Sequence, residues 1–135
     1  MLIIMQRIVL FSLVGLVLGG CAAQQQDAGE EPMVRIKPSR SYEECVQTLP
    51  GQAIEYSFQA SKPVDFNIHY HRGETIIFPV SEKETMASQG ALDCHQAMEE
   101  PSEKSEYFCL MWENPHDVSV GLDFEYTVTG PPDTE

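Results

Sequence analysis

Strict alternation of apolar and polar residues marks residues 64–71 as the clearest pattern in the chain. Successive side chains of a β-strand point to opposite faces, so a period of two predicts a strand that buries one face. The predicted buried face carries Val64, Phe66, Ile68 and Tyr70. The predicted polar face carries Asp65, Asn67, His69 and His71.

Further runs of the same period predict more strands, and no long helical pattern interrupts them. The runs cover residues 54–59, 75–80, 106–112 and 118–128. Turn-forming residues separate them at positions 50–51, 61–63, 72–73 and 114–117. The Arg72-Gly73 pair in particular is typical of a tight hairpin turn between antiparallel strands.

The alternation breaks down between residues 81 and 104, where the chain is mostly polar. The apolar residues Met86, Leu92 and Met98 are scattered there and match neither the helix period nor the strand period. We therefore expect a long loop or an irregular excursion over this segment.

Several short strands with one apolar face each must stack face to face to bury those faces. The sequence therefore predicts an all-β fold, a small antiparallel β-sandwich. Residues 33–129 have the usual length of one domain. Residues 130–135 contain two prolines and are predicted to be a disordered tail.

The N-terminal segment has one basic residue, Arg7, followed by an uncharged run over residues 8–20. A helix that crosses a membrane needs roughly twenty apolar residues, so this run is short for that purpose. Its length and its positive start instead fit a signal peptide over residues 1–20.

The residues Leu18-Gly19-Gly20-Cys21 at the end of this run resemble the bacterial lipobox. The resemblance implies that Cys21 is lipidated and that the chain is anchored to a membrane by its N-terminus. The next residue is Ala22 rather than Asp. In the lipoprotein pattern this implies the outer membrane, facing the periplasm, over the inner membrane. Residues 21–32 are small and polar, which predicts a flexible tether.

The acidic composition restricts the classes of partner that the chain can bind. The whole chain carries a formal charge of −13, and removal of residues 1–20 removes only Arg7, which leaves seven basic residues against 21 acidic ones, or −14. Such a surface repels phosphates, so we exclude nucleic acid as a partner. The chain also has no HExxH, no CxxC, no nucleophile elbow and no glycine-rich phosphate loop, so we expect no enzymatic activity.

The order of several motifs resembles the GOLD (Golgi dynamics) domain, the lumenal β-sandwich of eukaryotic cargo receptors. These motifs are Glu44-Cys45, the Pro50-Gly51 turn, the strand at 64–71, Phe78-Pro79-Val80, and the segment from Tyr107 to Asn114. The resemblance implies a disulfide between Cys45 and Cys109 and a non-catalytic interaction domain. The chain shows no coiled coil or transmembrane helix like those of the receptors, so it does not imply cargo sorting.

Three cysteines remain once Cys21 is lipidated, namely Cys45, Cys94 and Cys109. Disulfides are expected in an oxidising periplasm, and an odd number leaves one thiol over. With the pairing that the resemblance implies, Cys94 is the free thiol, either inert and buried or kept for a function. The alternative is a Cys94–Cys109 bridge with Cys45 free.

His69-x-His71 is the one arrangement with metal chemistry. Residues two apart on a strand point the same way, about 6.5–7 Å apart, so their imidazoles can converge on one ion. Cys94, His95 and Met111 add thiolate, imidazole and thioether ligands, which suit copper first and zinc second. The alternative is a solvent-facing histidine pair with no cofactor.

Together these patterns predict a membrane-anchored periplasmic lipoprotein with a non-catalytic binding domain. Its expected partners are the membrane, through the lipid, and an unidentified protein of the envelope. The alternative function is a metal-handling lipoprotein that holds copper or zinc on the His69-x-His71 face.

Overall fold

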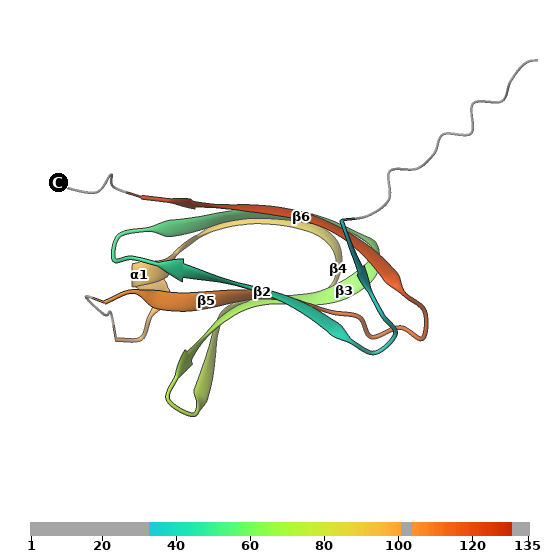
Figure 1. Ribbon diagram of the computed structural model, residues 1–135, viewed down its shortest axis with the longest axis horizontal. Helices are drawn as coiled ribbons and strands as arrows, with labels where there is room; N and C mark the ends of the chain where they lie inside the picture. The colour runs from blue at the N-terminus through green and yellow to red at the C-terminus, as the bar shows by residue number, and fades with distance from the viewer. Residues whose placement is uncertain (1–32, 101–103, 131–135) are drawn as a thin grey trace, which may run out of the picture.

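The computed structural model describes residues 33–100 and 104–130, which form six strands and one short helix (Figure 1). The elements are β1 (Val34–Ile36), β2 (Ser41–Thr48), β3 (Ala53–Arg72), β4 (Thr75–Asp93), α1 (Cys94–Ala97), β5 (Glu106–Glu113) and β6 (Val120–Thr129). The predicted all-β fold is confirmed. The predicted signal peptide, Cys21 with the tether, and residues 131–135 of the predicted tail lie outside the described residues.

All six strands belong to one antiparallel sheet, in the order β1-β6-β3-β5-β2, with β4 paired to the free side of β3. The long strand β3 organises this sheet. Residues 53–60 of β3 pair with β6, whereas residues 65–70 pair with β5. β4 follows β3 along nearly its whole length.

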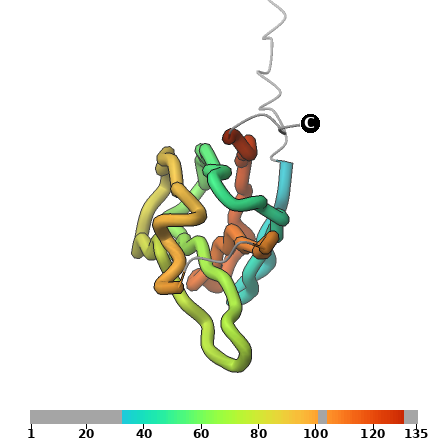
Figure 2. Tube along the Cα trace, turned by 90° about the vertical axis from the view of Figure 1, so that its left-hand side faces the viewer, coloured from blue at the N-terminus to red at the C-terminus, as the bar shows by residue number. Residues whose placement is uncertain are grey.

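The sheet curls on itself, so that its two halves face each other across the core (Figures 1 and 2). The first layer contains β1, β6, residues 53–60 of β3 and residues 87–93 of β4. The second layer contains β2, β5, residues 64–72 of β3 and residues 75–85 of β4. The register between β3 and β4 shifts between Gln59 and Val64. Pro63 lies in this interval, where the lack of an N–H suits an interrupted ladder.

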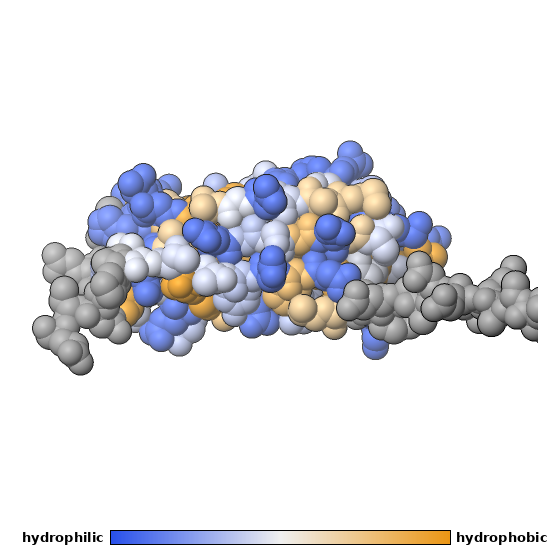
Figure 3. All heavy atoms as spheres, turned by 90° about the horizontal axis from the view of Figure 1, so that it is seen from above, coloured by the Kyte–Doolittle hydropathy of each residue, from blue (hydrophilic) through white to orange (hydrophobic). Residues whose placement is uncertain are grey.

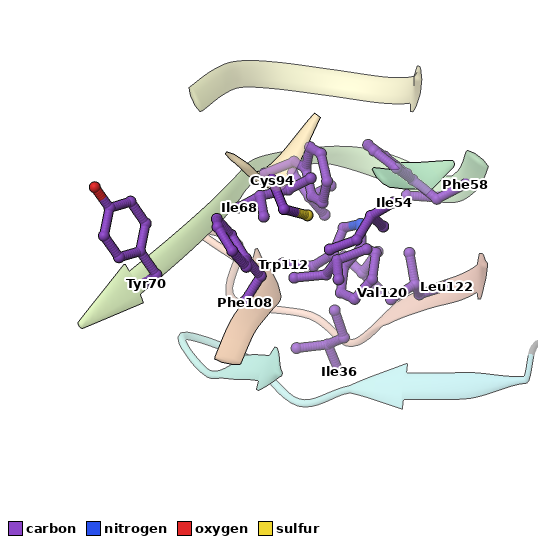
Figure 4. Close-up of a cluster of buried hydrophobic side chains, with 14 of the residues drawn as sticks. Ile36, Ile54, Phe58, Ile68, Tyr70, Cys94, Phe108, Trp112, Val120 and Leu122 are labelled. Carbon is purple, nitrogen blue, oxygen red and sulfur yellow. The ribbon is translucent and has the colours of Figure 1, made fainter. Parts of the chain in front are cut away.

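Aromatic rings from both layers meet in the core (Figure 4). Trp112 of the second layer packs against Phe58 and Phe124 of the first, with ring centroids 5.8 Å and 4.8 Å apart. The four residues predicted to line the buried face of residues 64–71 are all in this core, Val64, Phe66, Ile68 and Tyr70. Burial of these faces between the two layers provides the main driving force for the fold.

Two sequence predictions are wrong. Residues 61–63 do not form a turn between strands, because β3 runs through them as one bent strand. The long loop predicted for residues 81–104 is replaced over residues 81–97 by regular structure. β4 continues to Asp93, and α1 follows, capped by the Asp93 carboxylate, which accepts from the Gln96 N–H at 3.0 Å. β4 is an edge strand with no fully buried residue. Main-chain pairing with β3, rather than burial of an apolar face, therefore holds it in the sheet.

Two predicted turns, at residues 72–73 and 114–117, are confirmed. Gly73 has a φ of +59°, a conformation that favours glycine, and lies in the two-residue turn between β3 and β4. Between β5 and β6, the Asn114 amide nitrogen lies 3.1 Å from the Ile36 carbonyl oxygen and 2.8 Å from that of Val118. Asn114 therefore joins this loop to the end of β1.

Candidate functional site

The outer side of the second layer carries the residues of interest, and we call it the disulfide face. It is made of outward side chains from β2, β3, β4 and β5: Glu43, Cys45, Asn67, His69, His71, Ile76, Phe78, Tyr107, Cys109 and Met111. Strand register sets its centre, because Cys109 is paired with Cys45 on one side and with His69 on the other. Paired residues of neighbouring strands lie side by side on the same face.

A disulfide joins Cys45 and Cys109, which confirms the pairing that the GOLD resemblance implied. The Cys45 side of the bridge is exposed and the Cys109 side is buried. The alternative Cys94–Cys109 bridge is excluded, because Cys94 is a free thiol. The bridge encloses a long stretch of chain, with a sequence separation of 64.

Cys94 lies in the core, with 1 % of its surface exposed, and its sulfur sits among apolar side chains (Figure 4). Burial raises the pKa of this thiol, so it stays protonated and unreactive. The side chain is on the inner side of the sheet, and His69 is on the outer side. The structure therefore removes Cys94 from the metal-ligand set that the sequence predicted.

The other three predicted metal ligands do not all lie beside His69. His95 lies in α1, and its Nδ1 atom is buried with no hydrogen-bond partner among the described residues. Met111 is half-buried on the disulfide face, where its strand register places it between Asn67 and Glu43. His71 is exposed, and its ring centroid is 5.4 Å from that of His69. Only Met111 and His71 therefore accompany His69.

His69 itself is buried, with 4 % of its surface exposed, so the expectation of a solvent-facing pair is wrong for this residue. The Phe78 ring covers it from β4, at a centroid distance of 5.5 Å. Its Nδ1 atom is 2.8 Å from Asn67 Oδ1, and its Nε2 atom is 3.1 Å from Glu43 Oε1. An amide from its own strand and a carboxylate from β2 thus hold the imidazole from both sides.

Burial lowers the pKa of His69, and this outweighs the opposing attraction of Glu43. The Glu43 side chain is 44 % exposed, so water weakens its field at the ring. The neutral ring has one N–H, and the tautomer decides whether Nδ1 donates it to Asn67 Oδ1 or Nε2 donates it to Glu43 Oε1. Both neighbours are acceptors, so in either tautomer one ring nitrogen faces an acceptor without a proton.

Glu43, His69 and Cys109 form a cluster in which one ligand atom from each lies within 4.8 Å of the others. Neither Glu43 nor Asn67 is among the metal ligands that the sequence predicts. One signal for Asn67 was present, since it stands two residues before His69 on the same polar face. No such signal existed for Glu43, because only the pairing of β2 with β5 brings it to His69.

The disulfide face also exposes large apolar side chains. Ile76, Phe78 and Tyr107 have 46 %, 50 % and 56 % of their surfaces exposed. Ile76 is paired with His71 in the β3–β4 ladder, and Tyr107 lies two residues before Cys109 on β5. These three residues thus lie around the histidines and the disulfide.

The outer side of the first layer differs, and we call it the polar face. Its outward side chains are mostly polar, and they include the small apolar Ala87 and Ala91. The polar ones are Glu55, Ser57, Gln59, Gln89, Asp123 and Glu125. The Ser57 hydroxyl donates to Glu125 Oε1 across the β3–β6 pair at 3.1 Å. Figure 3 views the side of the molecule on which β6 lies, where hydrophilic residues are spread over the surface.

Comparison of the sequence with protein-family models finds no matching family, and comparison with curated proteins finds no matching relative. Among residues 33–100 and 104–130, no helix is long and apolar enough to cross a membrane.

Proposed function

We propose that this protein is a lipoprotein of the bacterial envelope whose β-domain is a non-catalytic binding module. Cys21 carries the lipid and holds the chain at the outer membrane, on its periplasmic side. The disulfide face is the binding surface, and its partner is another envelope protein. The observation that carries this proposal is that three of the seven large apolar side chains exposed among the described residues lie on this one face, namely Ile76, Phe78 and Tyr107.

Exposed apolar side chains that gather on one face are typical of a surface that contacts a partner. Aromatic residues in particular are enriched at protein interfaces. The polar face offers no such group of side chains. A strongly acidic chain also excludes nucleic acid, which leaves a protein partner as the reading that fits the surface.

Site-specific photo-cross-linking in the intact envelope tests the binding surface. A photoreactive phenylalanine analogue replaces Phe78 or Tyr107 on the disulfide face, or Gln59 or Glu125 on the polar face. We expect both disulfide-face positions to give the same adduct and both polar-face positions to give none. Equal adducts from the two faces, or none from Phe78 and Tyr107, would overturn the proposed surface.

Fractionation of the envelope tests the anchor. Cys21→Ser should abolish incorporation of labelled palmitate and release the chain from the outer-membrane fraction. Ala22→Asp is the matched control, because it keeps the lipidated cysteine and should move the chain to the inner membrane. Palmitate incorporation that persists in Cys21→Ser contradicts the anchor.

A second candidate function is metal handling, and the 3.1 Å approach of His69 Nε2 to Glu43 Oε1 favours it. In the tautomer with the proton on Nδ1, one cation can bind both atoms. The metal site that the sequence predicts uses His69 and His71, and its test uses the disulfide-bonded protein. Copper or zinc retained by the non-reduced full chain, and lost in His69→Ala/His71→Ala, would support it; no retained metal would exclude it.

A further inference from the structure

We infer that reduction of the Cys45–Cys109 disulfide creates a zinc site on the disulfide face, formed by both cysteine sulfurs, His69 and Glu43. This inference deepens the metal-handling candidate, because it assigns a different ligand set and makes binding depend on the oxidation state. It is independent of the binding surface formed by Ile76, Phe78 and Tyr107.

The described residues already place three of the four donors together. One ligand atom from each of Glu43, His69 and Cys109 lies within 4.8 Å of the other two. Cys45 is bonded to Cys109, so its sulfur lies beside the same cluster. Two sulfurs, one imidazole and one carboxylate are four donors of the kinds that Zn²⁺ takes in tetrahedral sites.

The imidazole is also prepared for a metal. A metal-binding histidine usually donates its second N–H to a nearby oxygen, which fixes the ring and its tautomer. Asn67 Oδ1 lies 2.8 Å from His69 Nδ1 and is placed to accept from it in this way. In that tautomer Nε2 carries the lone pair 3.1 Å from Glu43 Oε1, and one cation can contact both atoms.

The disulfide form lacks two of these donors. Thiolates bind metals, whereas the sulfurs of a disulfide are neutral and bonded to each other. The non-reduced protein therefore offers only His69 and Glu43 at this position. Reduction adds two thiolates to the same place without moving either strand, because β2 and β5 are paired from Ser41–Glu113 to Thr48–Glu106.

A dithiol supplies the electrons by thiol–disulfide exchange. Its thiolate attacks the exposed Cys45 sulfur, the Cys45–Cys109 bond breaks, and Cys109 leaves as a thiolate. The second thiol of the reductant then attacks the mixed disulfide and releases Cys45. The dithiol is oxidised to a disulfide, both cysteines are reduced, and Zn²⁺ binds the two thiolates as their protons pass to solvent.

The test uses the full chain in detergent, with zinc as the probe. One sample is reduced anaerobically with a water-soluble phosphine, which takes the oxygen of water and leaves two thiols, and is then desalted. The other sample stays oxidised. After zinc addition and a second desalting, we expect roughly one equivalent of zinc on the reduced chain and none on the oxidised chain.

Variants identify the ligands. His69→Gln and Glu43→Gln should each weaken zinc binding by the reduced chain, whereas His71→Ala, an exposed neighbour on the same strand, should keep it. Asn67→Ala should weaken binding by about 10–100-fold, the usual loss when a group that orients a metal ligand is removed. Cobalt in place of zinc should give thiolate-to-metal charge-transfer absorption in the reduced wild type.

Several outcomes would overturn the inference: equal zinc on the oxidised and reduced chains, no zinc on the reduced chain, or full retention by reduced His69→Gln. If reduction unfolds the domain, zinc should restore its circular dichroism with an end-point of roughly one equivalent. A reduced chain that neither refolds nor binds zinc also rejects the site. None of these results affects the cross-linking test of the binding surface.

Discussion

The two outer faces of the curled sheet share one core but follow different rules. On the polar face, outward residues such as Ser57 and Glu125 are polar and bond across strands at the surface. On the disulfide face, outward positions hold a buried imidazole, a cross-strand disulfide and exposed aromatic rings. Strands β3 and β4 contribute to both faces, on either side of the bend, whereas β2 and β5 complete the disulfide face and β6 completes the polar face.

This difference between the two faces shows which outward side chains simply suit a solvated sheet and which depart from that pattern. An outward position needs only a side chain that water tolerates, and the polar face meets this requirement. A buried His69 that faces a carboxylate and is covered by an apolar ring departs from this pattern. Positions that depart from the local rules are where functional sites are expected, so the disulfide face is the place to look for function.

Among changes to the outward positions of the two faces, removal of the disulfide has the largest expected effect. Cys45→Ala/Cys109→Ala should lower the free energy of unfolding by about 2–4 kcal/mol, because the bridge restricts the unfolded chain over a long loop. Denaturant unfolding of the full chain, non-reduced and with a chelator present, measures this loss.

The polar face provides the matched control. Ser57→Ala/Glu125→Ala removes a cross-strand contact of exposed side chains and should change the free energy of unfolding by no more than about 0.5 kcal/mol. Equal losses for the two double variants would mean that the faces contribute alike to stability, and the comparison would fail.

A smaller effect is expected from pH. Burial lowers the pKa of folded His69 below its unfolded value of about 6.5. As the pH falls below about 6.5, the unfolded state therefore takes up a proton before the folded state does, and the free energy of unfolding decreases. One such group gives a slope of at most about 1.4 kcal/mol per pH unit. Denaturant unfolding between pH 5 and 7 should show a shallower slope for His69→Gln than for wild type.

His71→Gln is the control for this slope. His71 is exposed on the same strand, and its charge also lowers the pKa of His69, although less than burial does. His71→Gln should therefore keep most of the wild-type slope. Glu43 from β2 is the group that opposes the effect, since its charge favours protonated His69. A wild-type slope of the opposite sign relative to His69→Gln would show that Glu43 prevails over burial.

The sequence was sufficient for the parts of the fold that depend on period-two patterns. It predicted the buried face of residues 64–71 and the hairpin turn at Gly73, because alternation and turn chemistry are local. It failed for β4 beyond residue 80, because an edge strand can be held by main-chain pairing with a polar, unpatterned sequence. It also placed a turn at residues 61–63, where a bend within one strand suffices.

The site was predicted only in part, for a related reason. His69 and His71 were identified from their spacing, and the resemblance supplied the Cys45–Cys109 pair. The burial of His69 and its contact with Glu43 were missed, because both depend on which strand lies beside which. Cys94 was assigned to the site on its ligand chemistry, whereas its position one residue after β4 places it in the core.

The smallest expected change in the free energy of unfolding gives the sharpest test of the difference between the two faces. Tyr107→Ser and Ile76→Ser should each change the free energy of unfolding by no more than about 0.5 kcal/mol, because both side chains are largely exposed. Phe108, the buried neighbour of Tyr107, is the control, and Phe108→Ala should cost about 3–5 kcal/mol in the same denaturant unfolding assay. If Tyr107→Ser and Ile76→Ser leave the free energy of unfolding nearly unchanged, the fold does not require the exposed apolar surface of these two residues. A loss close to that of Phe108→Ala would instead make these residues part of the packing, and the argument for a binding surface would lose its main support.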